Sequence, residues 1–154
     1  MREILFKAKR IDNGEWVEGS YLNCKGSTTY KHNIRTFDDE WGVEWVEVDE
    51  TTICQYTGLT DKNGNKIWEN DVVRDTEDDM TMVVRWDDEE LRFVLDDYGY
   101  TGCVMEYGFD EFAGIFDVVD TYGFNDFCKT VDKFVEVIGN IFDNPELLEG
   151  GGEE

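Results

Sequence analysis

Basic residues are scarce in this sequence. Of its 154 residues, 14 are Lys or Arg and 37 are Asp or Glu, so the formal net charge at pH 7 is −23. The deficit is uneven, because residues 1–74 carry ten basic and fourteen acidic residues, whereas residues 75–154 carry four and twenty-three. Nucleic acids and anionic membranes are bound by Lys and Arg side chains that neutralise phosphate. We therefore expect no direct contact with DNA, RNA or a membrane.

Long apolar runs are also missing. No segment approaches the roughly 18 apolar residues of a transmembrane helix, and the start MREILFKAKRIDNGEW lacks the apolar stretch of a signal peptide. We expect a cytoplasmic protein. A hydrophobic fraction of 40% with 14% aromatic residues is too high for a disordered chain. The length predicts one domain over residues 1–148, with a division into an N-terminal and a C-terminal β subdomain left open, followed by a disordered acidic tail at 149–154.

The sequence has no closely spaced metal ligands and no catalytic motif. Cys24, Cys54, Cys103 and Cys128 lie far apart, and His32 is the only histidine. Zinc sites usually take ligands in local pairs, so we expect free thiols, no metal and no cofactor. Phosphate-binding glycine loops, G-x-S-x-G and H-E-x-x-H are absent. Carboxylate pairs are so abundant that they indicate nothing specific; a hydrolase using such a pair is a less favoured alternative to a protein that is not an enzyme.

Signals for β-strands and tight turns are plentiful. Asn13-Gly14 predicts a two-residue hairpin turn after the strand Ile4–Lys9, because both residues tolerate positive φ. Asp61–Asn65 predicts a second turn before Ile67 and Trp68. This segment superficially resembles the start of an EF-hand, but Lys66 replaces the required glycine and Val72 the bidentate glutamate. We interpret it as a hairpin and not as a calcium site.

Further strands are predicted along the rest of the chain. They cover residues 16–21, 30–37, 43–48, 51–56, 80–86, 91–95 and 133–141, and Gly139 in the last predicts either a bulge or a close approach of another segment. The alternation in Val43–Val48 does not decide which side chains face the core. Apolar spacing predicts a short helix over Phe124–Asp132, and Asn144-Pro145 predicts the capped start of another. The fold class is therefore mainly β, with antiparallel hairpins and one or two short helices.

Two stretches resemble a known family. Tyr56–Val73, YTGLTDKNGNKIWENDVV, and Val137–Leu148, VIGNIFDNPELL, are similar to the hallmark segments of the YopX family of small bacteriophage and prophage proteins, and the opening MREILFKAKR is similar to its usual start. The resemblance implies a small SH3-like, partly open barrel with additional strands, a bacterial host cell, an unassigned function and no catalytic residues. One departure is Glu69-Asn70-Asp71, where the family commonly has an acidic residue, Gly and Asp; Asn also tolerates the left-handed conformation.

The acidic, aromatic middle of the chain is the predicted binding region. Aromatic residues between glycines and acids in Tyr98–Phe112 favour an exposed loop, and aromatic residues dominate interface hot spots. We expect a protein partner with a basic face, and the acidic charge also raises the hypothesis of nucleic-acid mimicry. A homo-oligomeric structural protein is the alternative. The candidate binding residues are Tyr98, Tyr100, Tyr107, Phe109, Asp87, Asp88, Glu89 and Glu90.

Overall fold

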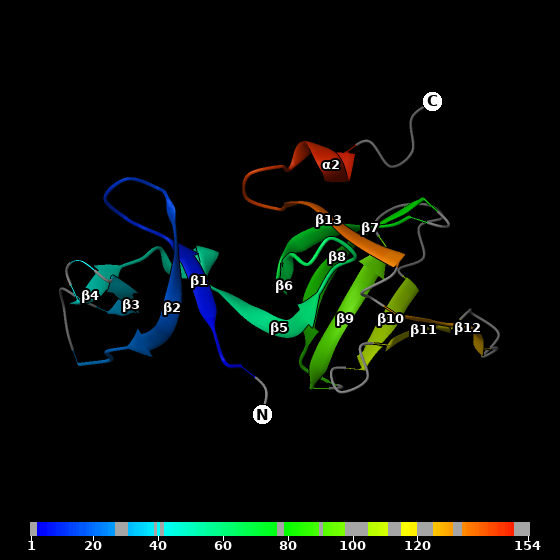
Figure 1. Ribbon diagram of the computed structural model, residues 1–154, viewed down its shortest axis with the longest axis horizontal. Helices are drawn as coiled ribbons and strands as arrows, with labels where there is room; N and C mark the ends of the chain where they lie inside the picture. The colour runs from blue at the N-terminus through cyan, green and yellow to red at the C-terminus, as the bar shows by residue number, and fades with distance from the viewer. Residues whose placement is uncertain are drawn as a thin grey trace. The chain divides into compact units, whose positions relative to one another are not determined.

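The chain forms two compact units, Met1–Tyr56 and Thr57–Glu154, here called the N-terminal and C-terminal units. A computed structural model describes residues 3–26, 31–38, 40, 42–76, 79–89, 91–97, 105–110, 115–119, 125–130 and 134–149. Both units are built from antiparallel strands, as Figure 1 shows. The predicted mainly β fold class is confirmed, and the sheets are open. Among the described residues, no helix is long and apolar enough to cross a membrane.

The N-terminal unit is a curled antiparallel sheet. Its elements are β1 (Phe6–Lys9), β2 (Trp16–Asn23), β3 (His32–Asp38), β4 (Gly42–Glu47), the 3-10 turn η1 (Glu50–Thr52) and the start of β5 (Cys54–Thr60). The strand order is β4-β3-β2-β1-β5, so β4 lies at an edge. Just beyond β4, Val48 forms a bridge with Arg10, and the N–H of Ile11 donates to the carbonyl oxygen of Glu47. These contacts bend the end of β4 back towards β1 and give the partly open barrel.

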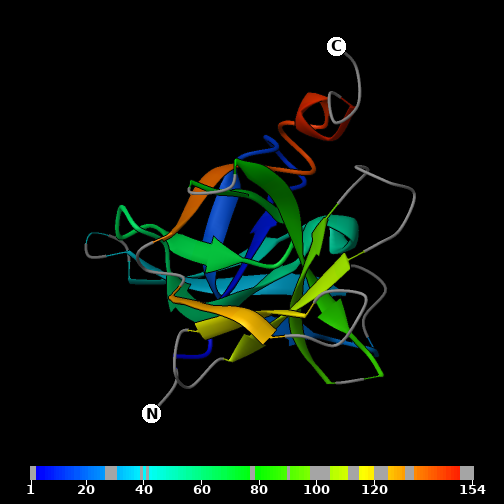
Figure 2. The ribbon, with the colours of Figure 1, turned by 90° about the vertical axis from the view of Figure 1, so that its right-hand side faces the viewer.

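The C-terminal unit contains a seven-stranded sheet. β5 runs on into this unit and pairs there with β6. The strand order of the larger sheet is β12-β11-β10-β9-β8-β7-β13. Figures 1 and 2 show β13 (orange) leading into the short helix α2 (red). The bounds are β6 (Lys66–Trp68), β7 (Asp71–Asp75), β8 (Met80–Asp87), β9 (Arg92–Asp97), β10 (Met105–Asp110), β11 (Ile115–Val119), β12 (Asn125–Thr130), β13 (Val135–Asn140) and α2 (Glu146–Glu149).

Each unit has its own apolar core. In the N-terminal unit, alternate residues of the strands place a small set of side chains on the concave side: Ala8, Ile34, Val46 and Val48. The core of the C-terminal unit is larger: Ile67, Val73, Met82, Val84, Phe93, Leu95 and Val135. Consecutive residues of β8, from Met82 to Val84, are all buried, so this strand is covered on both faces.

One buried carboxylate connects the two stretches that carry the family resemblance. The side chain of Asp61 is almost fully buried and accepts hydrogen bonds from the backbone N–H groups of Asn63 (2.9 Å), Asn65 (2.8 Å) and Val137 (2.9 Å). Lys62 N–H donates to the carbonyl oxygen of Val135. Asp61 therefore shapes the predicted turn and also ties it to β13, because an ionised carboxylate has enough acceptor sites for all three donors.

A second contact between the same stretches depends on Asn70. Its φ of 70° confirms the left-handed conformation expected where the family commonly has glycine. Its carbonyl oxygen accepts from Ile141 N–H at 3.0 Å. The neighbouring Asp71 accepts from Trp68 N–H at 2.8 Å, which closes the turn between β6 and β7. The two hallmark segments thus form one hydrogen-bonded substructure.

The end of β13 confirms the expected irregularity at Gly139. The pairing with β7 shifts between Val137 and Gly139, which marks a bulge. A Cβ at Gly139 would lie 2.5 Å from Oδ1 of Asn144 and 2.9 Å from Cδ1 of Leu147. Leu147 therefore packs back on the strand. Asn144 does not cap α2 as predicted, because its side-chain oxygen accepts from the N–H of Asn140 at 3.3 Å.

Two other local predictions were wrong. The first hairpin closes between Arg10 N–H and Glu15 C=O around a four-residue loop, and only Gly14 has positive φ, so it is not a two-residue turn. Asn13 instead uses its side-chain oxygen to accept from Glu15 N–H. In the second case, the segment predicted as a helix over 124–132 contains strand β12, which pairs with β11. Long-range pairing has outweighed the helical spacing of its apolar residues.

Candidate functional site

The predicted acidic binding residues lie at one turn of the C-terminal unit. Asp87 ends β8, and Asp88 and Glu89 are exposed in the turn before β9. One Asp87 oxygen accepts from Glu89 N–H at 2.8 Å, so this carboxylate helps to form the turn. Glu90 lies outside the described residues. The acidic turn between two strands is confirmed as a structural feature, and its role in binding stays a prediction.

The aromatic part of that prediction is only partly covered by the structure. Tyr98 and Tyr100 lie outside the described residues. Tyr107 and Phe109 belong to β10, which pairs with β9 on one side and β11 on the other, so the expected loop is wrong for these two positions. The register opposes Gly108 to Val94, which places Phe109 towards the end of the sheet that carries the acidic turn.

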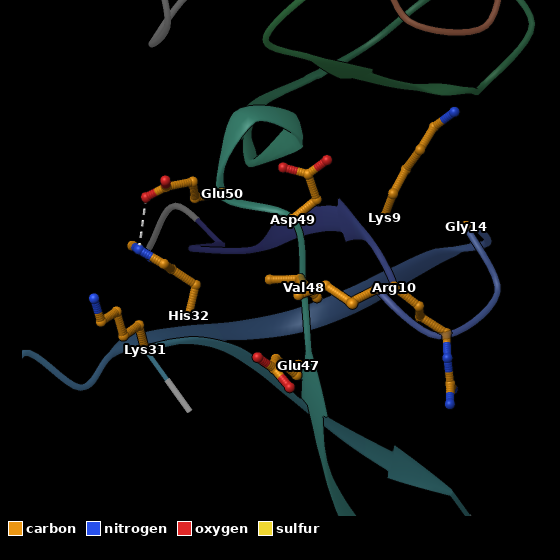
Figure 3. Close-up of a pocket in the computed structure, with 10 residues that line it drawn as sticks. Lys9, Arg10, Gly14, Lys31, His32, Glu47, Val48, Asp49 and Glu50 are labelled. Carbon is orange, nitrogen blue, oxygen red and sulfur yellow. Dashed lines mark ion pairs between the residues drawn. The ribbon is translucent and has the colours of Figure 1, made fainter. Parts of the chain in front are cut away.

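A polar pocket of about 600 Å³ opens in the N-terminal unit. Figure 3 shows side chains from β1, the first hairpin and the segment after β4 around it. It contains His32, the only histidine of the chain. Three Lys or Arg side chains and three carboxylates also line the pocket, and they are Lys9, Arg10, Lys31, Glu47, Asp49 and Glu50.

His32 is engaged on both ring nitrogens. Nε2 lies 2.8 Å from a Glu50 oxygen, and Nδ1 lies 2.6 Å from the hydroxyl of Tyr21, whose ring stacks on the imidazole. A carboxylate only accepts, so Nε2 carries the proton and, in the neutral ring, Nδ1 accepts from the Tyr21 hydroxyl. Burial, followed by the charge of Glu50, raises the pKa of Tyr21, which keeps this hydroxyl protonated. Both ring nitrogens of His32 therefore already have partners within the protein.

Other charged side chains at the pocket also form ion pairs or hydrogen bonds within the protein. Arg10 forms a two-pronged ion pair with Asp12, with both N–O distances 2.9 Å. This hydrogen bond raises the pKa of Arg10 and lowers the pKa of Asp12. Asp49 accepts from both the N–H and the hydroxyl of Thr51 and so caps the 3-10 turn η1. The pocket is therefore lined largely by groups that stabilise the loops around it.

The opposite, convex side of the same sheet carries a different kind of surface. Alternation puts Ile34 and Val46 into the core, so their neighbours along β3 and β4 point outwards. Phe37 faces Val43 across the two strands, and both are exposed, at 71% and 46%. Trp45, opposite Arg35, is 55% exposed. We call the group Leu22, Phe37, Val43 and Trp45 the outer apolar face.

Local contacts hold part of the outer apolar face in place. The guanidinium carbon of Arg35 lies 5.5 Å from the centre of the Trp45 ring, within cation–π range. Beside the ring is a hollow of about 370 Å³ lined by Leu22, Cys24, Asn33 and Trp45. Trp45 is therefore an exposed aromatic side chain with a held orientation next to a cavity, which is a common arrangement at protein interfaces.

Sequence reasoning missed this surface because the alternation in Val43–Val48 permits two face assignments. Either Val43 and Trp45 or Val46 and Val48 could point to the core, and the apolar content of both sets is similar. The pairing with β3 decides the question, since Val46 lies opposite Ile34. Because side chains alternate along a strand, Trp45 then lies on the outer face.

Among the described residues, no cluster of three or more His, Cys, Asp or Glu side chains could hold a metal ion. Cys24 and Cys54 are free thiols, as expected. Cys54 is buried, and its thiol donates to the carbonyl oxygen of Thr52 at 3.2 Å. This places Cys54 in a structural role under the 3-10 turn.

Comparisons with known proteins agree with the resemblance of the hallmark segments. The family described as YopX protein matches residues 5–149, almost the whole chain. The chain is also similar to the crystal structure of protein EF1440 from Enterococcus faecalis, with 21% identity, a TM-score of 0.50, and coverage of 96% of this chain and 99% of that one. This likeness concerns the fold alone. No curated protein matches the chain. The chain belongs to the YopX family.

Proposed function

We propose that this protein is a phage or prophage accessory protein that acts in the cytoplasm of the bacterial host as a protein-interaction module and not as an enzyme. Its binding surface is the outer apolar face. The observation that carries the proposal is the exposure of Leu22, Phe37, Val43 and Trp45 on one side of a single sheet. Exposed apolar groups of this kind mark interaction sites when they are contiguous.

Covering the exposed aromatic side chains of this surface would contribute part of the free energy of binding. Phe and Trp each bury about 150–250 Å² when fully covered, so covering the exposed parts of Phe37 and Trp45 removes roughly 200 Å² from water. At about 25 cal/mol per Å² this contributes about 5 kcal/mol. Part of it offsets the entropy lost on association. The ring of Trp45, already held by Arg35, loses little further freedom on binding.

The charge of the chain supports a partner with a basic surface. A net charge of −23 repels a second copy of the same chain at long range and attracts a basic protein. This argument weighs against the alternative of a homo-oligomeric structural protein. The polar pocket beside His32 supports a catalytic role less well than the outer apolar face supports binding, because His32 and Arg10 already have partners.

The proposal is tested by quantitative pull-down from bacterial host lysate with three forms of the full chain. These are the wild type, the double variant Phe37→Ser/Trp45→Ser, and the control Leu91→Ser, which changes a residue of similar exposure, 70%, in the C-terminal unit. We expect proteins recovered by the wild type to be lost with the double variant and retained with the control. Equal recovery by all three forms would show that the outer apolar face is not the binding surface.

A further inference from the structure

The edge of β4 has open backbone hydrogen-bonding groups beside the outer apolar face. β4 pairs with β3 on one side only. At its end the carbonyl of Glu47 turns away from β3 to accept from Ile11, whereas Val48 N–H turns towards β3 and donates to His32. Backbone groups in an antiparallel ladder alternate in direction. The N–H and C=O groups of Val43 and Trp45 therefore point to the open side, and no bond to them is found among the described residues.

The residues with outward backbone groups are also those with exposed apolar side chains. Val43 and Trp45 thus offer four hydrogen-bonding groups and two apolar side chains to an added strand. Side chains directly opposite each other share one face of a sheet. An added strand would therefore place apolar residues opposite Val43 and Trp45, on the outer apolar face.

The charges on β4 indicate which residue of the added strand should lie between the two apolar ones. β4 has the sequence GVEWVE, with two carboxylates and no basic residue or proline. Soluble proteins usually protect edge strands against pairing with a second copy by charged side chains, Pro or a bulge. Here Glu44 lies between Val43 and Trp45 and is exposed, so the edge repels another copy of this acidic chain and attracts a strand with Lys or Arg opposite Glu44.

We propose that the edge of β4 binds an extended segment of a basic protein, in which apolar and basic residues alternate, by adding it as a further strand of the sheet. This inference rests on the proposed function and specifies how the outer apolar face is used. Backbone hydrogen bonds to Val43 and Trp45 supply register, and the apolar side chains supply selectivity. Glu44 selects for a basic residue at the intervening position.

The test uses the full chain and a synthetic peptide in which Lys and Val alternate over about seven residues. Binding is measured by isothermal titration at low and at moderate salt. Two peptide controls isolate the two elements of the proposal: one has Glu in place of Lys, and the other has the same Lys-Val sequence with alternate backbone nitrogens methylated. We expect the Lys-Val peptide to bind, and both controls to bind at least about tenfold more weakly.

Two protein variants test the same backbone hydrogen bonds by changing Val43 instead of the peptide. Val43→Pro removes an N–H that points away from β3, and proline is tolerated on edge strands in that orientation. Val43→Ala is the matched control, because it loses the side chain and keeps the N–H. We expect Val43→Pro to lower the affinity at least about fivefold more than Val43→Ala, with circular dichroism confirming that both are folded. If Val43→Pro does not fold, the methylated peptide provides the same comparison.

Several results would overturn the inference. One is the absence of binding by the Lys-Val peptide, and another is equal binding of the methylated and unmethylated peptides. A third is a defined multimer of the free protein that dissociates with Val43→Pro, which would make a second copy the occupant of the edge. Light scattering measures this directly. If the peptide fails while pull-down still depends on Phe37 and Trp45, strand addition is wrong and the broader function stands.

Discussion

Strand β8 of the C-terminal unit is covered differently from strands β3 and β4 of the N-terminal unit. In the C-terminal unit, β8 buries Met82, Val83 and Val84 in succession, so both faces of the strand are covered. In the N-terminal unit, β3 and β4 bury Ile34 and Val46 but expose Phe37, Val43 and Trp45. A sheet covered on both faces has used its apolar side chains for stability. A sheet covered on one face keeps apolar side chains available for a partner.

The units also differ in net charge, and the unit with the outer apolar face carries the smaller negative charge. Residues 1–56 carry seven basic and eleven acidic residues, a net charge of −4, whereas residues 57–154 carry seven and twenty-six, a net charge of −19. The exposed apolar group is therefore found in the less charged unit. Our proposal therefore places the binding surface outside the most acidic part of the chain, where solvated acids also serve solubility.

The largest expected effect is the loss of a core aromatic residue in the C-terminal unit. Phe93 is 1% exposed and Phe37 is 71% exposed, so they provide the same side chain in opposite environments. We expect Phe93→Ala to lower the free energy of unfolding by about 3–5 kcal/mol and Phe37→Ala to change it by less than about 0.5 kcal/mol. Urea denaturation measures both. If both variants lowered the free energy of unfolding by similar amounts, Phe37 would contribute to stability as Phe93 does, and the contrast between the two units would be wrong.

The next effect concerns the carboxylate that connects the hallmark segments. Asp61→Ala removes the acceptor for the N–H groups of Asn63, Asn65 and Val137, and we expect the free energy of unfolding to fall by about 3 kcal/mol. Asp61→Asn keeps the oxygen that serves Asn63 and Asn65 and should cost clearly less. Amide exchange should become faster at all three positions in Asp61→Ala. Unchanged exchange at Val137 would mean that Asp61 does not hold β13.

A smaller effect is expected at the crossing of β2 and β3 in the N-terminal unit. A Cβ at Gly19 would lie 2.1 Å from the carbonyl oxygen of Arg35, so the strands must move apart to accept a methyl group. We expect Gly19→Ala to destabilise the protein by about 2 kcal/mol. Gly26→Ala is the control, because nothing lies within 4 Å of a Cβ there. If the control costs as much, steric overlap at β3 is not the cause.

The smallest effect comes from the cap of the 3-10 turn. Hydrogen bonds from the side chain and then the backbone of Thr51 lower the pKa of Asp49 from its ordinary value of 3.8. We expect Asp49→Ala to cost about 1 kcal/mol at neutral pH. A lowered folded-state pKa gives a contribution that is complete above the unfolded-state pKa and is lost as the pH falls through the folded-state pKa.

The stabilities of wild type and Asp49→Ala should therefore converge in strongly acidic solution, as followed by thermal melting across pH. Asp49→Asn is the control, since its amide oxygen accepts at every pH. A difference between wild type and Asp49→Ala that stays constant down to strongly acidic pH would contradict the role of the carboxylate.

Three local backbone features were predicted correctly from the sequence, although the type of the first hairpin turn and the cap at Asn144 were not. The Asp61–Asn65 turn, the left-handed Asn70 and the bulge at Gly139 all lie where the residues indicated. Each depends on the conformational preferences of one or a few neighbouring residues. The helix predicted over Phe124–Asp132 was wrong because the conformation there depends on a distant segment. Strand β12 within it is set by pairing with β11. The roles of the acidic turn and of Tyr98 and Tyr100 stay predictions.

The candidate site illustrates the same limit. Trp45 was one of several tryptophans in the sequence, and nothing local separates it from Trp68, which is 5% exposed, while Trp45 is 55% exposed. His32 acquires its partners Tyr21 and Glu50 only when β2, β3 and the 3-10 turn come together. Contacts between distant residues are not contained in local periodicity, so sequence reasoning could name these residues without placing them.

By itself the sequence determined the family, the antiparallel β class, the positions of the main turns and the acidic character of the chain. These follow from residue preferences and composition, which act over short distances or over the chain as a whole. The tertiary structure decided which face of each strand is buried, that Asp61 joins the two hallmark segments, and that β4 is an open edge with Val43 and Trp45 turned outwards. The physical reason is that the burial of a strand face depends on which strands pair and in which register, and a shift of one residue reverses it.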